Sequence, residues 1–150
     1  MILYTNARSI LSKIDHLNIL INDENPHLVL LTESWCNDEI TNAMINIEGY
    51  EVVPELRVDR LDTVNGIGGG LLVYKRLDIT VKPESDESSF NQYCKFQLIP
   101  ENSKPLSIPL NISLIYRSPN SKEENNEKLV KLVEEHKSNC FFIKTVCFIR

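Results

Sequence analysis

The chain has 150 residues, of which 42% are hydrophobic and 25% are charged, and its formal net charge is -5. This length and composition predict one soluble globular domain, since a chain of this size can bury about 68–70% of its unfolded surface. The negative charge argues against a protein that merely coats nucleic acid, because most of the affinity of such proteins comes from neutralising phosphates. It still allows an enzyme that holds DNA through a few contacts and a metal ion.

The cysteines and the two ends of the chain predict where the protein is found. Cys36, Cys94, Cys140 and Cys147 show no C-x-x-C spacing and no nearby histidine, which argues against a zinc site or a disulfide framework. The N-terminus lacks the charged segment and long apolar run of a signal peptide. The apolar run near the C-terminus is too short to span a bilayer, and Lys144 interrupts it. We therefore expect a nuclear or cytoplasmic protein that is neither secreted nor bound to a membrane.

The first 32 residues predict two strands with a helix between them. Residues 2–4 form a short apolar run, and residues 28–32 form a continuous apolar run that is typical of a strand covered on both faces. Between them, residues 9–23 repeat apolar side chains at helical spacing, with Ser9 or Ser12 as the N-cap. This order predicts that the two strands are parallel neighbours.

The rest of the chain predicts mostly strands. We expect a short helix at 38–44, strands at 50–53, 71–75, 79–82, 93–99, 110–116 and 140–143, and a charged amphipathic helix at 123–136. The polar residues 83–89 and the segment 100–109 predict loops. The glycine-rich residues 66–70 do not match a phosphate-binding loop, because they lack G-K-[ST] and precede a strand; a tight or bulged strand start is the better interpretation. Just before them, Arg57, Asp59 and Arg60 form either a solvated charge cluster or a phosphate contact.

Three polar residues stand at the ends of predicted strands, where α/β proteins bind their ligands. Glu33 follows the run 28–32, and it is either a metal-binding carboxylate or an ordinary glutamate that faces solvent or pairs with an arginine. Asn6 could donate to a phosphate or orient a water, or it could cap the turn into the first helix. Tyr116 could donate to a reacting oxygen, or it could pack at the sheet edge with its hydroxyl in water. Arg117 could clamp a phosphate.

Taken in order, these segments resemble the endonuclease/exonuclease/phosphatase family, and within it the endonuclease domains of non-LTR (LINE-type) retrotransposons, which are associated with a reverse transcriptase. The matching stretches are N-A-R-S-I-L-S-K-I-D-H-L, P-H-L-V-L-L-T-E-S-W, E-G-Y-E-V-V, R-V-D-R, G-G-G-L-L-V-Y and I-Y-R-S-P-N-S. The resemblance extends over nearly all of residues 2–143. The ordered set is specific, although each stretch alone is a weak signal.

The resemblance implies an α/β fold, an incomplete four-layer α/β sandwich of the DNase I-like type. It also implies Mg²⁺- or Mn²⁺-dependent cleavage of phosphodiester bonds, with DNA as the partner; it gives no basis for inferring an obligate protein partner. Carried over by position, Glu33 resembles the metal-binding glutamate, Asn6 the active-site asparagine near metal and phosphate, and Tyr116 the tyrosine that assists at the scissile phosphate. Arg117 is a candidate substrate-binding residue.

One segment departs from the family pattern. After a strand such as 140–143 the family has G-D-x-N, whose Asp and Asn orient or deprotonate the attacking water, whereas this chain has K-T-V-C from Lys144. We therefore expect residues 1–143 to be the N-terminal part of such a domain and residues 144–150 to be a divergent apolar tail. Because catalytic groups act as a unit, we expect cleavage near background.

Two other functions stay open at this point. The chain could be a non-catalytic remnant that binds a protein or a nucleic acid. It could also be a phosphatase of the same fold that acts on a small or lipid phosphate. The stretches N-A-R-S and Y-R-S-P-N favour the retrotransposon branch over the phosphatase.

Overall fold

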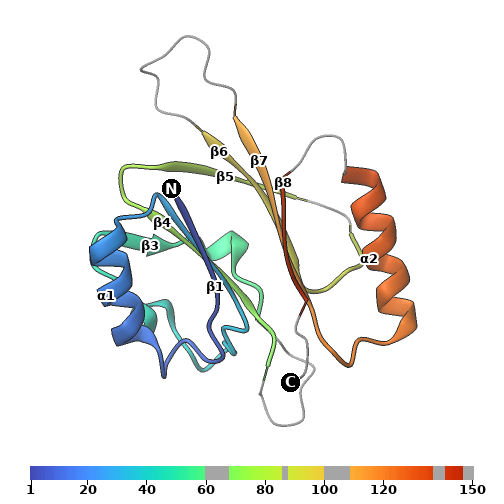
Figure 1. Cartoon of the computed structure of the whole chain (residues 1–150), viewed down its shortest axis with the longest axis horizontal. Helices are drawn as coiled ribbons and strands as arrows, with labels where there is room; N and C mark the ends of the chain where they lie inside the picture. The colour runs from blue at the N-terminus through green and yellow to red at the C-terminus, as the bar shows by residue number, and fades with distance from the viewer. Residues whose placement is uncertain (60–67, 86–87, 100–108, 137–140, 147–150) are drawn as a thin grey trace.

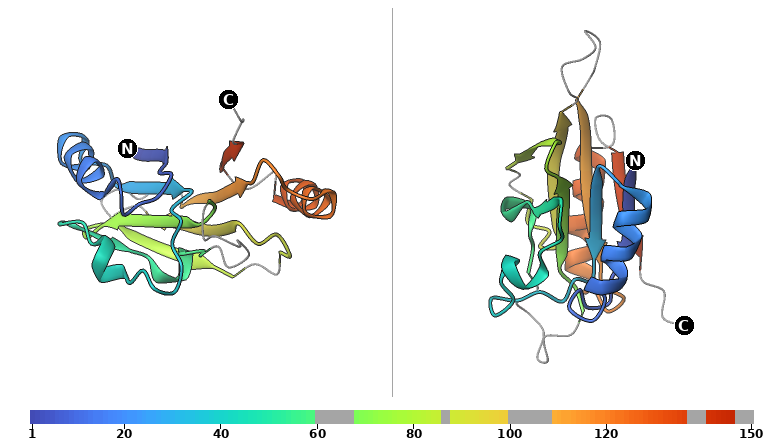
Figure 2. Two further views of the ribbon diagram at one scale, coloured as in Figure 1. Left: turned by 90° about the horizontal axis from the view of Figure 1, so that it is seen from below. Right: turned by 90° about the vertical axis from the view of Figure 1, so that its left-hand side faces the viewer.

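The protein is a sandwich of four layers, in which two four-stranded sheets pack face to face and one helix covers the outer side of each sheet (Figure 1 and Figure 2). The computed structural model describes residues 1–59, 68–85, 88–99, 109–136 and 141–146. Within these ranges the four layers of the predicted α/β sandwich are all present. No helix among the described residues is long and apolar enough to cross a membrane.

The first sheet has the strand order β1-β2-β4-β3. Its strands are β1 (Ile2–Asn6), β2 (Leu28–Thr32), β3 (Tyr50–Val52) and β4 (Leu71–Arg76). β1 and β2 are parallel, with Asn6 beside Thr32, which confirms the predicted pairing. All five residues of β2 are buried, because β2 lies inside the sheet and both of its faces are covered. β4 runs antiparallel to both of its neighbours.

The helix between β1 and β2 begins later than predicted. α1 spans Ile14–Glu24, and its N-cap is Lys13, with no side-chain capping hydrogen bond. A helix that follows a cap at Ser9 is wrong, because residues 10–13 form a bend and a turn and because Arg8 and Ser9 have positive φ angles, which a right-handed helix does not allow. Ser12, the other predicted cap, donates its hydroxyl to the Ser9 carbonyl instead. Asn25 ends the helix in the left-handed conformation.

Two short 3-10 helices follow in the first half of the chain. η1 spans Asn42–Ile45 and replaces the short helix predicted at 38–44. η2 spans Pro54–Leu56 and separates β3 from a single bridge between Val58 and Leu71 at the start of β4.

The second sheet has the strand order β5-β6-β7-β8. Its strands are β5 (Thr80–Glu84), β6 (Tyr93–Ile99), β7 (Leu110–Arg117) and β8 (Phe141–Val146). β5, β6 and β7 are antiparallel, while β8 is parallel to β7 and follows the helix α2 (Glu123–His136).

Two boundaries in the second sheet differ from the prediction. Pro83 lies within β5 and not in the loop predicted at 83–89, because β5 is an edge strand, where a residue without an N–H is tolerated. β8 continues through Lys144 and Thr145 to Val146, beyond the boundary predicted after residue 143. The loop predicted at 100–109 falls almost entirely outside the described residues.

Three apolar cores hold the layers together. The central core joins the inner faces of the two sheets, with Leu30 and Val73 from the first sheet against Phe96 and Leu114 from the second. The other cores lie between α1 and the first sheet and between α2 and the second sheet. Each sheet therefore packs one face on the other sheet and the opposite face on a helix, as a sandwich with helices on the outside requires.

The buried thiol of Cys94 predicts a loss of stability at high pH. Burial raises the pKa of Cys94 from its ordinary value of 9.0 to about 12. The unfolded thiol ionises first, so the stabilisation is complete below pH 9 and is lost as the pH rises toward 12. Urea unfolding should show that raising the pH from about 8 to 10 costs about 1.4 kcal/mol more in the natural chain than in Cys94→Ala. An equal pH dependence of the two proteins would contradict this assignment.

Candidate active site

The backbone after β2 turns sharply and holds Glu33 at the carboxyl end of the strand. Glu33 and Trp35 have φ angles of 52° and 57°, which side chains other than glycine rarely adopt. Hydrogen bonds fix this turn on both sides. The Ser34 and Trp35 amides donate to the carbonyls of Gly70 and Gly69 at 3.3 and 3.0 Å, and the Ser9 amide donates to the Glu33 carbonyl at 3.0 Å. Strained backbone of this kind persists only where the surroundings determine it, and it is frequent at functional sites.

Glu33 and Tyr116 meet between the two sheets. The Tyr116 hydroxyl donates to Glu33 Oε1 at 3.1 Å, and the two residues are 2% and 6% exposed, Tyr116 being the more buried. Tyr116 reaches Glu33 because the alternation along β7 points Ile112, Leu114 and Tyr116 toward the first sheet. The structure thus excludes the two simpler interpretations, a solvent-facing glutamate and a tyrosine with its hydroxyl in water.

Asn6 stands at the same end of the first sheet as Glu33. Its Cα pairs with that of Thr32, the residue just before Glu33. The Oδ1 atom of Asn6 is buried and accepts no hydrogen bond from the residues that the structure describes. Capping of the following turn by this oxygen is therefore not seen there. A buried amide oxygen without a donor is suited to a metal ion, a water or a substrate group.

Tyr4 is a second phenol near Glu33, at a position that the sequence patterns did not indicate. Burial is the main cause that raises the pKa of Tyr4; Thr32 opposes this effect, and the negative charge of Glu33 adds to it. Tyr4 precedes Asn6 by two residues in β1, so both side chains lie on the same face of the sheet. This periodicity is the one signal by which the sequence could have placed Tyr4 at the site.

The two arginine predictions have different outcomes. Arg117 donates from Nε to Asn126 Oδ1 on α2 at 2.8 Å, so its side chain contacts the helix. Arg57 forms a two-pronged ion pair with Asp59, at 2.8 and 2.9 Å, and also binds Asn42 Oδ1 and the Asn37 carbonyl. These contacts make Arg57 a link between loops. Arg60 lies outside the described residues.

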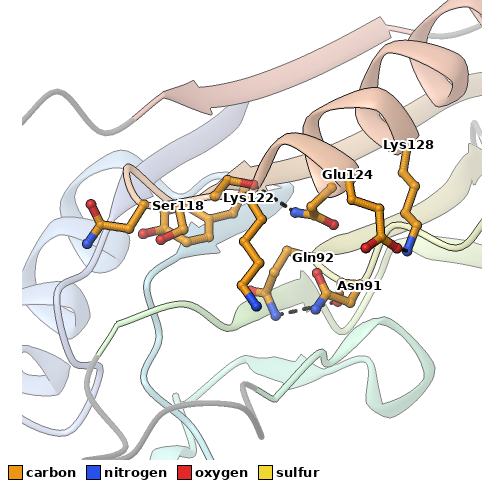
Figure 3. Close-up of a pocket in the computed structure, with 10 residues that line it drawn as sticks. Asn91, Gln92, Ser118, Lys122, Glu124 and Lys128 are labelled. Carbon is orange, nitrogen blue, oxygen red and sulfur yellow. Dashed lines mark hydrogen bonds and ion pairs between the residues drawn. The ribbon is translucent and has the colours of Figure 1, made fainter.

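A polar pocket of about 370 Å³ lies beside Tyr116 (Figure 3). Lys122, just before α2, and Gln92, just before β6, both turn their side chains into it. The other lining residues are polar apart from the Tyr116 ring, and Lys128 at its rim is paired with Glu124 at 2.8 Å. The pocket gives solvent and a ligand access to the region next to Tyr116.

No family model matches the sequence, and no curated protein matches it. Comparison with solved structures gives matches over nearly the whole chain. The endonuclease domain of TRAS1, a telomere-specific non-LTR retrotransposon, is 14% identical with a TM-score of 0.62, over 95% of this chain and 57% of that one. An AP endonuclease from Archaeoglobus fulgidus is 14% identical with a TM-score of 0.55, over 91% of this chain and 49% of that one.

A third similar structure is the 3′-5′ exonuclease NExo from Neisseria meningitidis, at 12% identity and a TM-score of 0.58, over 95% of this chain and 55% of that one. These three proteins share the two-sheet sandwich described above. The chain has the DNase I-like fold. This result confirms the predicted fold class and, at the level of the fold, the resemblance to the endonuclease/exonuclease/phosphatase family. The chain spans less than two thirds of the length of each of these structures.

The glycines before β4 support the Glu33 turn. Gly68, Gly69 and Gly70 all have positive φ angles, which confirms the predicted tight strand start for the described part of this segment. A Cβ on Gly70 would collide with Ser34 Oγ, next to Glu33, whereas a Cβ on Gly49 would meet nothing within 4 Å. Gly49 also has a positive φ angle, of 80°.

These two glycines make a matched pair of variants. Gly49→Ala should lower the free energy of unfolding by about 1–2 kcal/mol, the cost of a left-handed alanine. Gly70→Ala should cost about 1–3 kcal/mol more, because the added methyl group overpacks the Glu33 turn. Urea unfolding of both variants measures the difference. Equal losses of unfolding free energy in the two variants would show that Ser34 moves aside without cost.

Proposed function

We propose that the chain is part of a divalent-metal-dependent endonuclease domain that nicks DNA, of the kind found in non-LTR retrotransposons. The observation that carries this proposal is the buried hydrogen bond between Tyr116 and Glu33 at the carboxyl end of β2, with Asn6 at the end of the neighbouring parallel strand. A buried carboxylate is costly unless its charge is compensated. A cation bound at Glu33 would compensate it.

The oxygen atoms at this place fit Mg²⁺ or Mn²⁺. Glu33 supplies a carboxylate, and Asn6 supplies an amide oxygen that no described residue occupies. Mg²⁺ commonly takes one or two carboxylates and completes its octahedron with waters and substrate phosphate. The described residues contain no group of three His, Cys, Asp or Glu side chains that could hold a metal ion, so such binding would be weak. When bound, the ion would withdraw charge from the phosphoryl oxygens.

The protein's own residues would position the phosphate. Tyr116 borders the neighbouring pocket and gives its one hydroxyl proton to Glu33, so it would donate to a phosphoryl or leaving oxygen only after a cation takes over the Glu33 carboxylate. Asn6 can orient the phosphate or a water through its amide. Arg117 would contribute to substrate binding only after leaving Asn126.

We further propose that the chain by itself cleaves DNA no faster than background. Thr145 stands beside Tyr116 in the pairing of β7 with β8, and Lys144 stands beside Ile115. This is the segment where the family pattern has the Asp and Asn that activate water. Without a general base at this place, bound phosphate and metal have no activated nucleophile.

A phosphatase of the same fold is the second candidate. The observation that favours it is a structural match, at 12% identity and a TM-score of 0.58, to "3' phosphatase NExo" from Neisseria bound to a product DNA hairpin, over 95% of this chain and 55% of that one. An oligonucleotide with a 3′-phosphate end separates the two candidates, because a phosphatase releases inorganic phosphate from it and an endonuclease shortens it.

Binding of Mg²⁺ or Mn²⁺ should stabilise the fold through Glu33. At an ion concentration ten times the dissociation constant, the free energy of unfolding should rise by about 1.4 kcal/mol. Thermal unfolding with and without the ion measures this rise. Glu33→Gln should abolish it, and Glu39→Gln, at an exposed position, should preserve it. An unchanged response in Glu33→Gln would contradict the metal site.

Plasmid nicking tests the catalytic part of the proposal. Supercoiled plasmid incubated with the purified chain and Mg²⁺ should relax no faster than plasmid in buffer, because the water-activating groups are lacking. Nicking that disappears in EDTA and in Glu33→Gln would overturn the proposed inactivity and support the proposed reaction class. Nicking that persists in both would point to a contaminating nuclease.

A further inference from the structure

Gln92 makes one hydrogen bond to the glycine segment beside the Glu33 turn and another to Tyr116. It lies just before β6, is 9% exposed, and accepts from the Gly70 amide through Oε1 at 2.7 Å. Its backbone carbonyl accepts from the Tyr116 amide at 3.0 Å. Because the Gly70 N–H can only donate, it also fixes which end of the Gln92 amide faces it.

The bond to Gly70 continues toward Glu33. The carbonyls of Gly70 and Gly69 accept from the Ser34 and Trp35 amides, which directly follow Glu33. An unbroken series of hydrogen bonds therefore runs from the Glu33 turn through the glycines and Gln92 to Tyr116. Apart from the Tyr116–Glu33 bond itself, the named contacts of the central core are between apolar or aromatic side chains, and such contacts do not set a distance as closely as a directional bond does.

We infer that Gln92 is a positioning residue that sets how Glu33 and Tyr116 face each other. Its side chain restrains the glycine segment on which the strained Glu33 turn rests, and its backbone restrains Tyr116. The importance of this restraint for catalysis rests on the proposed function. The restraint itself is a property of the folded chain and can be measured without any activity.

The test uses one natural reporter on each side. Trp35 is the only tryptophan of the chain and lies within the Glu33 turn. Tyr116 can be followed by the ¹³Cζ signal of labelled tyrosine, assigned with Tyr116→Phe. Gln92→Leu removes the acceptor for Gly70 at nearly constant size. We expect a shift of the Trp35 emission, a shift of the Tyr116 signal, and about three- to tenfold faster hydrogen exchange of the Gly70 amide.

Two further variants serve as a rescue and as a control. Gln92→Glu keeps an oxygen that can accept from Gly70, and it should restore all three signals. Gln97→Leu makes the same change within β6 at the only other glutamine of the chain, and it should leave them unchanged. A response of Gln97→Leu equal to that of Gln92→Leu would overturn the inference, because the effect would then come from the strand in general.

Unchanged Trp35, Tyr116 and Gly70 signals in Gln92→Leu would also overturn it. If Gln92→Leu does not fold, Gln92→Asn replaces it, because its shorter amide cannot reach Gly70. Failure of both variants to fold would overturn the inference too, since Gln92 would then support the whole fold and not the site. A missing metal response with intact Gln92 effects would reject the proposed function and leave the positioning role standing.

Discussion

The packing of two apolar sheet faces against each other is the constraint on which the rest of the structure depends. Leu30 and Val73 in one sheet, and Phe96 and Leu114 in the other, remove their side chains from water only when the sheets are stacked. Stacking brings the carboxyl end of β2 opposite the end of β7. The hydrogen bond between Glu33 and Tyr116 is therefore a product of hydrophobic burial, which is the largest favourable contribution to folding.

The same packing raises the free-energy cost of any polar group at the site that lacks a hydrogen-bond partner. Glu33 is placed where water cannot solvate it freely, in a backbone conformation that few residues adopt. The Tyr116 hydroxyl donates to the carboxylate, while the backbone of the turn donates to the carbonyls of Gly69 and Gly70 and accepts from the Ser9 amide. A polar group is retained in such a place when its function needs it or when its neighbours satisfy it fully. The orphaned oxygen of Asn6 indicates that the described neighbours do not satisfy this region fully.

Sequence patterns predicted the elements that depend on local chemistry. The apolar run of β2 and the alternation in β7 gave nearly the correct bounds, because side-chain burial alone determines them. The predicted start of α1 was too early because the apolar residue Ile10 continues the helical spacing. In the structure Ile10 is buried, but it lies in the irregular segment before the helix. Pro83 was placed in a loop because an edge strand cannot be distinguished from a loop before its partner is known.

The candidate site likewise contains residues that sequence patterns indicate and residues that they do not. Glu33 and Tyr116 could be found because each ends an apolar strand, but their contact depends on how two sheets stack. Gln92 could not be found, since it acts through Gly70 and the backbone of Tyr116, and neither contact leaves a pattern in the sequence. Its neighbourhood, a polar stretch before β6, is ordinary for a loop.

The order of contacts along the chain has a consequence for folding. β5, β6 and β7 form a meander of sequence neighbours, and such local pairings form early. Glu33 and Tyr116 are 83 positions apart, so their bond forms only when one completed sheet docks on the other. By the same logic, a fluctuation that slightly separates the layers breaks this bond while every strand remains paired. The contact between Glu33 and Tyr116 therefore depends on the docking of the two sheets and not on strand pairing within either of them.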